Sequence, residues 1–126
     1  MSIPQIHASV ATTVVLFNLI LGAWGFLKYL RGEGMDGNFW GAIWLSPILG
    51  LAQALVGLVM VFMGLGVAVR AVHYLYGVLV VLSVPAAFAF TKGRDDRGAV
   101  LIYAATLLLV ALFGGRAQVT VYGFGL

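Results

Sequence analysis

Four long apolar runs constrain the fold of this chain more than any other feature. They cover about residues 7–28, 39–64, 67–90 and 98–115, and each is close to or longer than the roughly 20 residues that cross a bilayer as a helix. Of all residues, 63% are hydrophobic and 9% are charged, a balance far from that of water-soluble domains. We therefore expect a single all-α domain over residues 1–126 that spans the membrane four times.

The connections predict how these helices pack. The turn at residues 65–69 is short and uncharged, so the second and third helices must be antiparallel neighbours. The expected fold is an integral membrane up-down-up-down four-helix bundle, in which the first and third helices lie on a diagonal. With neighbouring axes 8–10 Å apart, diagonal axes are roughly 11–14 Å apart.

The basic residues predict the orientation in the membrane. The side opposite the charged loops holds Arg70 and Arg116, whereas the loops after the first and third helices hold Lys28, Arg31, Lys92, Arg94 and Arg97. Because cytoplasmic loops are enriched in lysine and arginine, both chain termini are expected outside, in the plasma membrane of a bacterium. The net charge of +3 comes from these few residues and does not indicate nucleic-acid binding.

Several kinds of chemistry are excluded or disfavoured. The chain has no cysteine, which excludes disulfides, thiolate metal sites, iron–sulfur clusters and covalent haem attachment. All four acidic residues lie in the two charged loops, and no acid–base pair, nucleophile or phosphate-binding loop stands out. The sequence does not decide whether the chain is an enzyme, but it favours a non-catalytic role.

The two histidines of the chain are the main candidates for a functional site. His7 begins the first helix and His73 begins the third, each about 6–9 Å inside its helix at the outer surface. An ionisable residue within a membrane span is costly unless something uses it. Two imidazoles that reach inward from diagonal helices can bind one iron between them, so the sequence predicts a haem b with His7 and His73 as metal ligands.

Small and basic residues complete the expected haem site. Gly50, Gly57 and Gly64 recur every seven residues and form a smooth seam that a helix or a flat ligand can approach. Gly77 lies one turn after His73 and leaves the face beside its imidazole bare. Met60 is expected at the same depth in the membrane as the two histidines. Arg70 and Arg116 lie on the same side of the membrane and are expected to contact the haem propionates. The expected cofactor-binding residues are His7, His73, Gly77, Arg70, Gly57, Met60 and Arg116.

Two amides are expected deeper in the membrane. Along their helices, Asn18 lies about 16 Å beyond His7, and Gln53 lies about 16 Å from Gly64, so both amides are at a similar depth. The sequence therefore predicts that these two side chains pair between the first and second helices.

The same residues also fit simpler roles. Membrane histidines can be headgroup-level residues, and glycine seams can serve helix packing alone. Copper is a further candidate, with His7, His73, Met60 and Met63 as nitrogen and thioether ligands. The alternative function is a non-catalytic accessory subunit that packs within a larger respiratory or photosynthetic membrane complex.

Three segments resemble a half-bundle of the haem A synthase family. They read I-H-A-S-V-A-T-T-V-V-L at 6–16, Q-A-L-V-G-L-V-M-V at 53–61 and A-V-H-Y-L-Y-G at 71–77. The resemblance implies that His7 and His73 are axial haem ligands. Pro4 stands where the family has a glutamate, and the chain supplies one half-bundle where the family has two. The resemblance thus implies a single b-type haem bundle, alone or as a homodimer, that transfers electrons or handles haem, because a six-coordinate haem has no open position for substrate.

Overall fold

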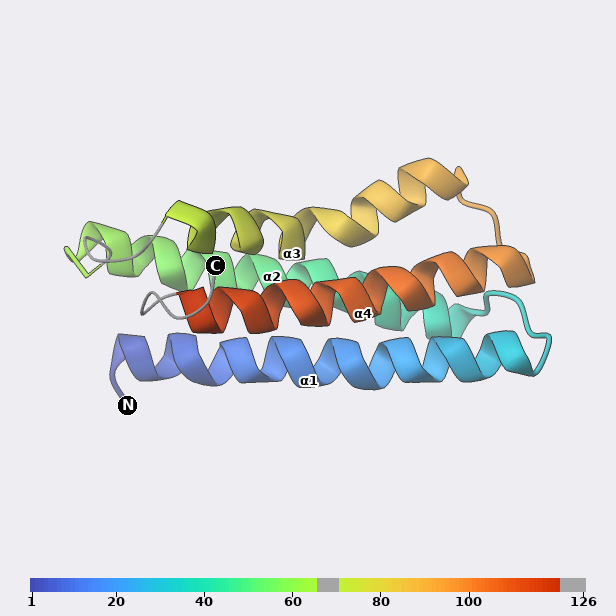
Figure 1. Cartoon of the computed structure of the whole chain (residues 1–126), viewed down its shortest axis with the longest axis horizontal. Coiled ribbons are helices and arrows are strands. Elements are labelled where there is room, and N and C mark those ends of the chain that lie inside the picture. Colours follow the sequence, from blue (N-terminus) through green and yellow to red (C-terminus); the bar gives the residue numbers. More distant parts are fainter. Residues whose placement is uncertain (66–70, 121–126) are drawn as a thin grey trace.

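The computed structural model describes residues 1–65 and 71–120 and shows four antiparallel helices (Figure 1). They are α1 (Ile3–Leu30), α2 (Gly37–Phe62), α3 (Ala71–Thr91) and α4 (Arg97–Thr120). All four are long and apolar enough to cross a membrane. The predicted all-α, up-down-up-down membrane bundle is confirmed.

The order of the helices around the bundle is also as expected. Helix α4 packs most extensively on α1 and then on α3, while α2 contacts both α1 and α3. Among the described residues the backbones of α1 and α3 do not approach each other. Helices α1 and α3 are therefore the diagonal pair, and a side chain that links them must cross the interior of the bundle.

The end of one helix differs from the expected one. Helix α1 begins at Ile3, ahead of its apolar run, because Ser2 and Gln5 form a reciprocal capping box. Helix α4 continues to Thr120 instead of ending at residue 115. Gly114 does not end the helix because it is buried against the side chains of Val14 and Val15, and glycine is tolerated in membrane helices where close packing replaces water. The expected start of the third helix, at residue 67, lies outside the described residues.

The core contains two hydrophobic clusters. The larger one lies toward the charged loops and centres on Phe39, Ile43 and Tyr103, all fully buried. The smaller one consists of Val14, Val80 and Val110. Val14 and Val80 each follow a histidine of the same helix by seven residues, so this cluster lies in the half of the bundle that contains the histidines.

Deep in the bundle, Asn18 pairs with a different residue from the one expected. Its side-chain amide donates to the Val14 carbonyl at 2.7 Å and accepts from the Ser46 hydroxyl at 2.6 Å. The predicted pair of Asn18 with Gln53 is wrong. At the end of the bundle where α1 begins, helix α2 extends beyond α1 (Figure 1). Gln53 therefore lies beside His7, and Ser46 lies beside Asn18.

The two charged loops are fastened to each other at the opposite end. The Lys28 side chain, 3% exposed, forms ion pairs with Glu33 at 3.1 Å and with Asp36 at 2.5 Å. The Met35 amide donates to the Asp95 carbonyl at 2.8 Å and thereby joins the first charged loop to the second. These contacts connect the α1–α2 loop to the α3–α4 loop at this end of the bundle.

The ion pair of Lys28 with Asp36 predicts an acid-sensitive part of the stability. The Lys28 ammonium, and next the Phe39 amide, donate to the Asp36 carboxylate and lower the pKa of Asp36 below its usual value. The folded state is thus stabilised above the unfolded pKa of about 3.9, and this contribution is lost as the pH falls through the lower folded value.

We expect the melting temperature of the purified protein to fall below about pH 4, and Asp36→Asn to remove part of this pH dependence. Thermal unfolding across that range measures it, with Asp95→Asn in the other loop as the control. An Asp36→Asn protein with the wild-type pH dependence would contradict the assignment.

Candidate functional site

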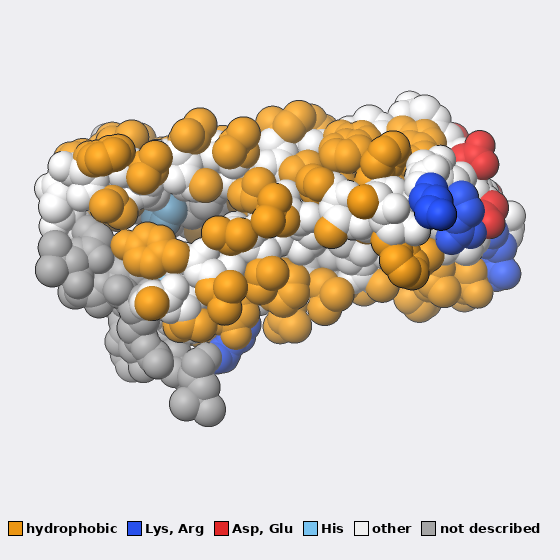
Figure 2. Space-filling view, turned by 90° about the horizontal axis from the view of Figure 1, so that it is seen from above, with side chains coloured by type: hydrophobic (Ala, Val, Ile, Leu, Met, Phe, Trp, Pro, Cys, Tyr) orange, Lys and Arg blue, Asp and Glu red, His pale blue; other side chains and the backbone are white. Residues whose placement is uncertain are grey.

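The structure brings the two histidines together inside the bundle. His7 reaches inward from the second turn of α1 and His73 from the first turn of α3, and their ring centres are 6.3 Å apart with 63° between the ring planes. The pair lies at the end of the bundle away from the charged loops. Figure 2 shows a histidine side chain at that end, in a gap between hydrophobic side chains.

The ring of His73 is oriented by α4. Its Nδ1 lies 2.7 Å from the carbonyl oxygen of Ala117. A carbonyl only accepts, so Nδ1 carries the hydrogen and donates it, which leaves the Nε2 lone pair for a metal. Metal-binding histidines are commonly fixed by such a bond to a backbone carbonyl. The contact exists because α4 continues past Gly114 and Gly115.

His7 is positioned by α2. A Cβ atom placed on Gly57 would lie 3.1 Å from Cε1 of His7, so the ring packs directly against the glycine backbone. One turn earlier, the Gln53 amide donates to the His7 carbonyl at 2.8 Å, and the same nitrogen lies 3.4 Å from the His7 Nε2. Gln53 is the site residue whose role the sequence did not reveal. The spacing of Gln53 and Gly57, four residues apart on one helix face, was the available signal.

Two polar atoms at this point lack partners. The Nδ1 of His7 and the Oε1 of Gln53 are buried and have no hydrogen-bond partner among the residues that the structure describes. A buried polar atom without a partner costs about 1–3 kcal/mol. Their presence beside the histidine pair favours a site that rearranges around a bound group over a pair that serves packing alone.

The other candidate residues lie around the pair in different ways. A Cβ on Gly77 would meet nothing within 4 Å, so Gly77 is no close helix contact. Met60 is partly buried in the last turn of α2, whereas Met63 is the C-cap of α2 and is 55% exposed. Arg116 precedes Ala117 on α4, and its side chain lines a groove between α4 and α1. Arg70 lies outside the described residues.

The spacing of the pair suits a single metal ion. Metal–nitrogen bonds of about 2 Å on each side place the centres of two imidazoles about 6 Å apart, which matches the observed 6.3 Å. The described residues hold no group of three histidine, cysteine or acidic side chains. Two imidazoles without a third such ligand are the set that a porphyrin complements, because the porphyrin supplies four more nitrogens. The residues present therefore fit a haem iron.

Comparisons of the chain with family models, with curated proteins and with solved structures find no match. The resemblance to the haem A synthase family stays a prediction.

The open face at Gly77 yields a test of the haem position. A leucine at position 77 meets no neighbour at its Cβ, so Gly77→Leu should leave the melting temperature of the haem-free protein nearly unchanged. A porphyrin beside His73 would meet the new side chain, and overpacking of this kind costs about 1–3 kcal/mol. Haem affinity should therefore fall.

Haem titration and melting of the haem-free protein measure both effects. Gly41→Leu is the matched control, because a Cβ on Gly41 of α2 also meets nothing within 4 Å. A Gly77→Leu protein with full haem affinity would place the porphyrin elsewhere.

Proposed function

We propose that this protein binds one haem b between His7 and His73 and uses it for electron transfer or for haem handling. The observation that supports this most directly is the meeting of the only two histidines of the chain, from diagonal helices, with ring centres 6.3 Å apart. The Ala117 carbonyl at His73 and the glycine surface at His7 support it further.

The type of ligation determines the type of function. With both axial positions held by imidazoles, the iron has no open position for oxygen or a substrate. The acidic residues do not supply a proton donor or acceptor near the histidines, because all four lie in the loops at the opposite end of the bundle. One-electron transfer needs neither, so we expect redox activity of the haem without catalysis of a substrate reaction.

Replacing the histidines tests the proposed function. His73→Ala should abolish haem retention, and His7→Ala should do the same or leave a weakly bound five-coordinate haem, because each variant removes one axial ligand. The absorption spectrum in the Soret region measures this in protein purified after haem reconstitution. Tyr76→Phe is the control, since it changes a neighbouring aromatic residue of α3 and no metal ligand.

Three results would contradict the haem proposal, and each points to a different alternative. An unchanged low-spin spectrum in the double histidine variant would mean that other residues bind the iron. Stoichiometric copper binding that needs both histidines, without a Soret band, would support a copper site with Met60. A folded protein that binds neither group would support an accessory subunit of a larger membrane complex.

The charge distribution supports the orientation that accompanies this proposal. Lysine and arginine side chains gather at the end of the bundle with the charged loops (Figure 2). We place that end in the cytoplasm of a bacterial cell and the histidine pair near the outer face of the plasma membrane. The apolar outer surface then faces lipid, a second copy of the chain or a larger membrane complex.

A fusion protein tests the orientation. Of two reporters fused after Leu126, the one that is active outside the cytoplasm should give a signal, and the one that is active in the cytoplasm should not. This result is expected because the basic loops at the opposite end of the bundle stay in the cytoplasm. A pair of reporters, one active in each compartment, provides the control. Activity of the cytoplasmic reporter alone would invert the topology and place the haem at the inner face.

A further inference from the structure

The guanidinium of Arg97 is held in one orientation at the end of the bundle with the charged loops. Arg97 is exposed and is the first residue of α4, and its side chain reaches across to the end of α1. Its Nε donates to the Tyr29 carbonyl at 2.7 Å, and its Cζ lies 3.9 Å from the centre of the Tyr29 ring. One hydrogen bond and one stacked face thus fix the guanidinium against α1.

The outer edge of this guanidinium is open. The bond to Tyr29 uses the hydrogen on Nε, so the hydrogens on the two Nη atoms remain. Among the residues that the structure describes, these two Nη atoms have no hydrogen-bond or ion-pair partner. Together they form the planar fork that binds a phosphate or a carboxylate through two parallel hydrogen bonds. Because the fork is already oriented, little side-chain freedom is lost when an anion binds.

The acidic side chains at this end do not occupy the fork. Three of the four acidic residues of the chain form ion pairs with other groups, Asp96 with Arg94 and both Glu33 and Asp36 with Lys28. The fourth, Asp95, forms no ion pair within the described part of the chain. The anion that matches the fork is therefore part of another molecule.

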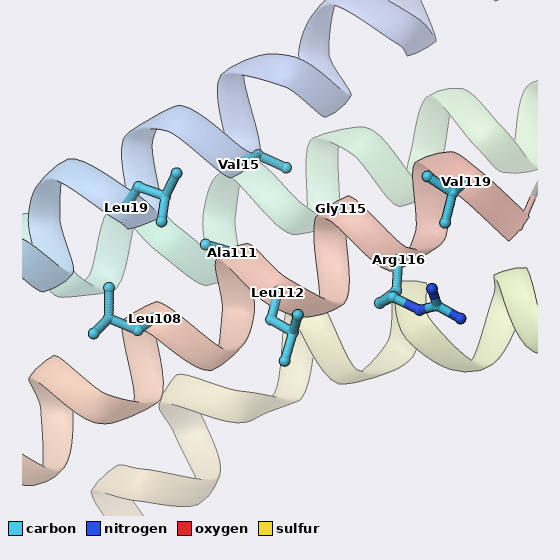
Figure 3. Close-up of a pocket in the computed structure, with 8 residues that line it drawn as sticks. All are labelled: Val15, Leu19, Leu108, Ala111, Leu112, Gly115, Arg116 and Val119. Carbon is cyan, nitrogen blue, oxygen red and sulfur yellow. The ribbon is translucent and has the colours of Figure 1, made fainter. Parts of the chain in front are cut away.

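Below Arg97, an apolar seam between α1 and α4 leads into the membrane. Phe26 is 43% exposed, and its ring centre lies 6.4 Å from that of Tyr29. Deeper in the membrane, Leu19 of α1 and Leu108 of α4 lie side by side (Figure 3). The helices rise about 15 Å from Tyr29 to Leu19 and about 16 Å from Arg97 to Leu108. The seam thus covers about half the roughly 30 Å of hydrocarbon, which is the depth of one lipid leaflet.

The depth of the fork specifies the kind of ligand. Tyr29 is the second-last residue of α1, and tyrosines at helix ends lie at the level of the lipid head groups. A free phosphate or an acidic protein would match the fork alone. An anionic phospholipid matches both parts, because its phosphate lies at the head-group level and its acyl chain lies below.

We propose that Arg97 and Tyr29 form a site for the phosphate of one anionic phospholipid, with an acyl chain along the seam from Phe26 to Leu19 and Leu108. The proposal does not depend on the haem site or on which side of the membrane holds the charged loops. A cap for the end of α1 needs one donor, which is the Nε of Arg97. The proposal assigns the two Nη atoms to the lipid.

The test measures lipid binding by the purified full-length protein. Phosphatidylglycerol and phosphatidylcholine with identical chains are added to delipidated protein in detergent, and binding is followed by native mass spectrometry. Wild-type protein should bind one phosphatidylglycerol and prefer it to phosphatidylcholine by about tenfold or more, as expected for a charge-assisted contact. Inorganic phosphate at the same concentration should not displace the lipid.

Variants of the fork test the head-group contact. Arg97→Gln should remove the preference for phosphatidylglycerol. Arg97→Lys should retain only part of it, because the charge and a donor for the Tyr29 carbonyl stay and the paired hydrogen bonds are lost. Tyr29→Leu should also lower the preference, since it removes the ring on which the guanidinium is stacked. Arg94→Gln is the matched control, with the same change of charge at an arginine that already pairs with Asp96, and should keep the full preference.

A variant of the seam tests the acyl-chain contact. Phe26→Ala should weaken binding of both lipids to a similar degree and leave the preference unchanged, because it removes apolar contact area and no charge. Phe62→Ala is its control, since Phe62 is 82% exposed near the end of α2, at the opposite end of the bundle.

Three results would overturn the proposal. An Arg97→Gln protein that melts early without lipid but keeps the full preference would limit Arg97 to capping α1. Equal losses of preference in Arg97→Gln and Arg94→Gln would show that net charge alone attracts the lipid. Displacement of the lipid by inorganic phosphate would identify a site for a free ion.

Discussion

Polar groups within the hydrocarbon of a bilayer have no water to bond, and this constraint explains most of the structure. The backbone satisfies itself within four helices. The few polar side chains of the spans must then bond to their own helix or meet between helices. Asn18 meets Ser46, Thr91 meets Tyr103, and Gln53 meets the carbonyl of His7. These contacts join α1 to α2 at two depths and α3 to α4 at a third, so together they help to specify the register of the bundle.

The same constraint positions the histidine pair. The Nδ1 of His73 finds its acceptor at Ala117 because α4 is long enough to reach that level. The His7 ring finds a flat surface at Gly57 and an amide at Gln53, because α2 extends beyond the start of α1. The Nδ1 of His7 and the Oε1 of Gln53 find no hydrogen-bond partner among the residues that the structure describes. This incomplete satisfaction distinguishes the pair from the bonded Asn18 contact deeper in the bundle.

Much of the fold could be predicted from the sequence, and the reason is physical. Apolar runs of this length have few alternatives to membrane helices, and short turns force neighbouring helices to be antiparallel. The diagonal placement of His7 and His73 followed from these two facts. The axial offset of α2 against α1 could not be predicted in this way. The sequence gives the depth of a residue only relative to the end of its own helix, and it does not say how far the ends of two helices are offset. The sequence therefore paired Gln53 with Asn18 and missed its contact with His7.

Local packing also escaped prediction. The pair Gly114–Gly115 resembles a helix end, and only the contact of Gly114 with Val14 and Val15 shows why the helix continues. Likewise, the sequence does not distinguish the surroundings of Gly57 and Gly77. The His7 ring packs against Gly57, whereas a Cβ on Gly77 would face open space. Whether a glycine supports a neighbour or leaves a gap depends on the neighbouring helix, which the local sequence does not contain.

The central claim is that two helices on a diagonal each supply one imidazole to the same iron. Hyperfine electron paramagnetic resonance on oxidised, haem-loaded protein with nitrogen-15 in its histidines tests this most directly. The expected result is a low-spin ferric signal coupled to two labelled axial nitrogens. A high-spin signal, or a low-spin signal coupled to one labelled nitrogen or none, would contradict it.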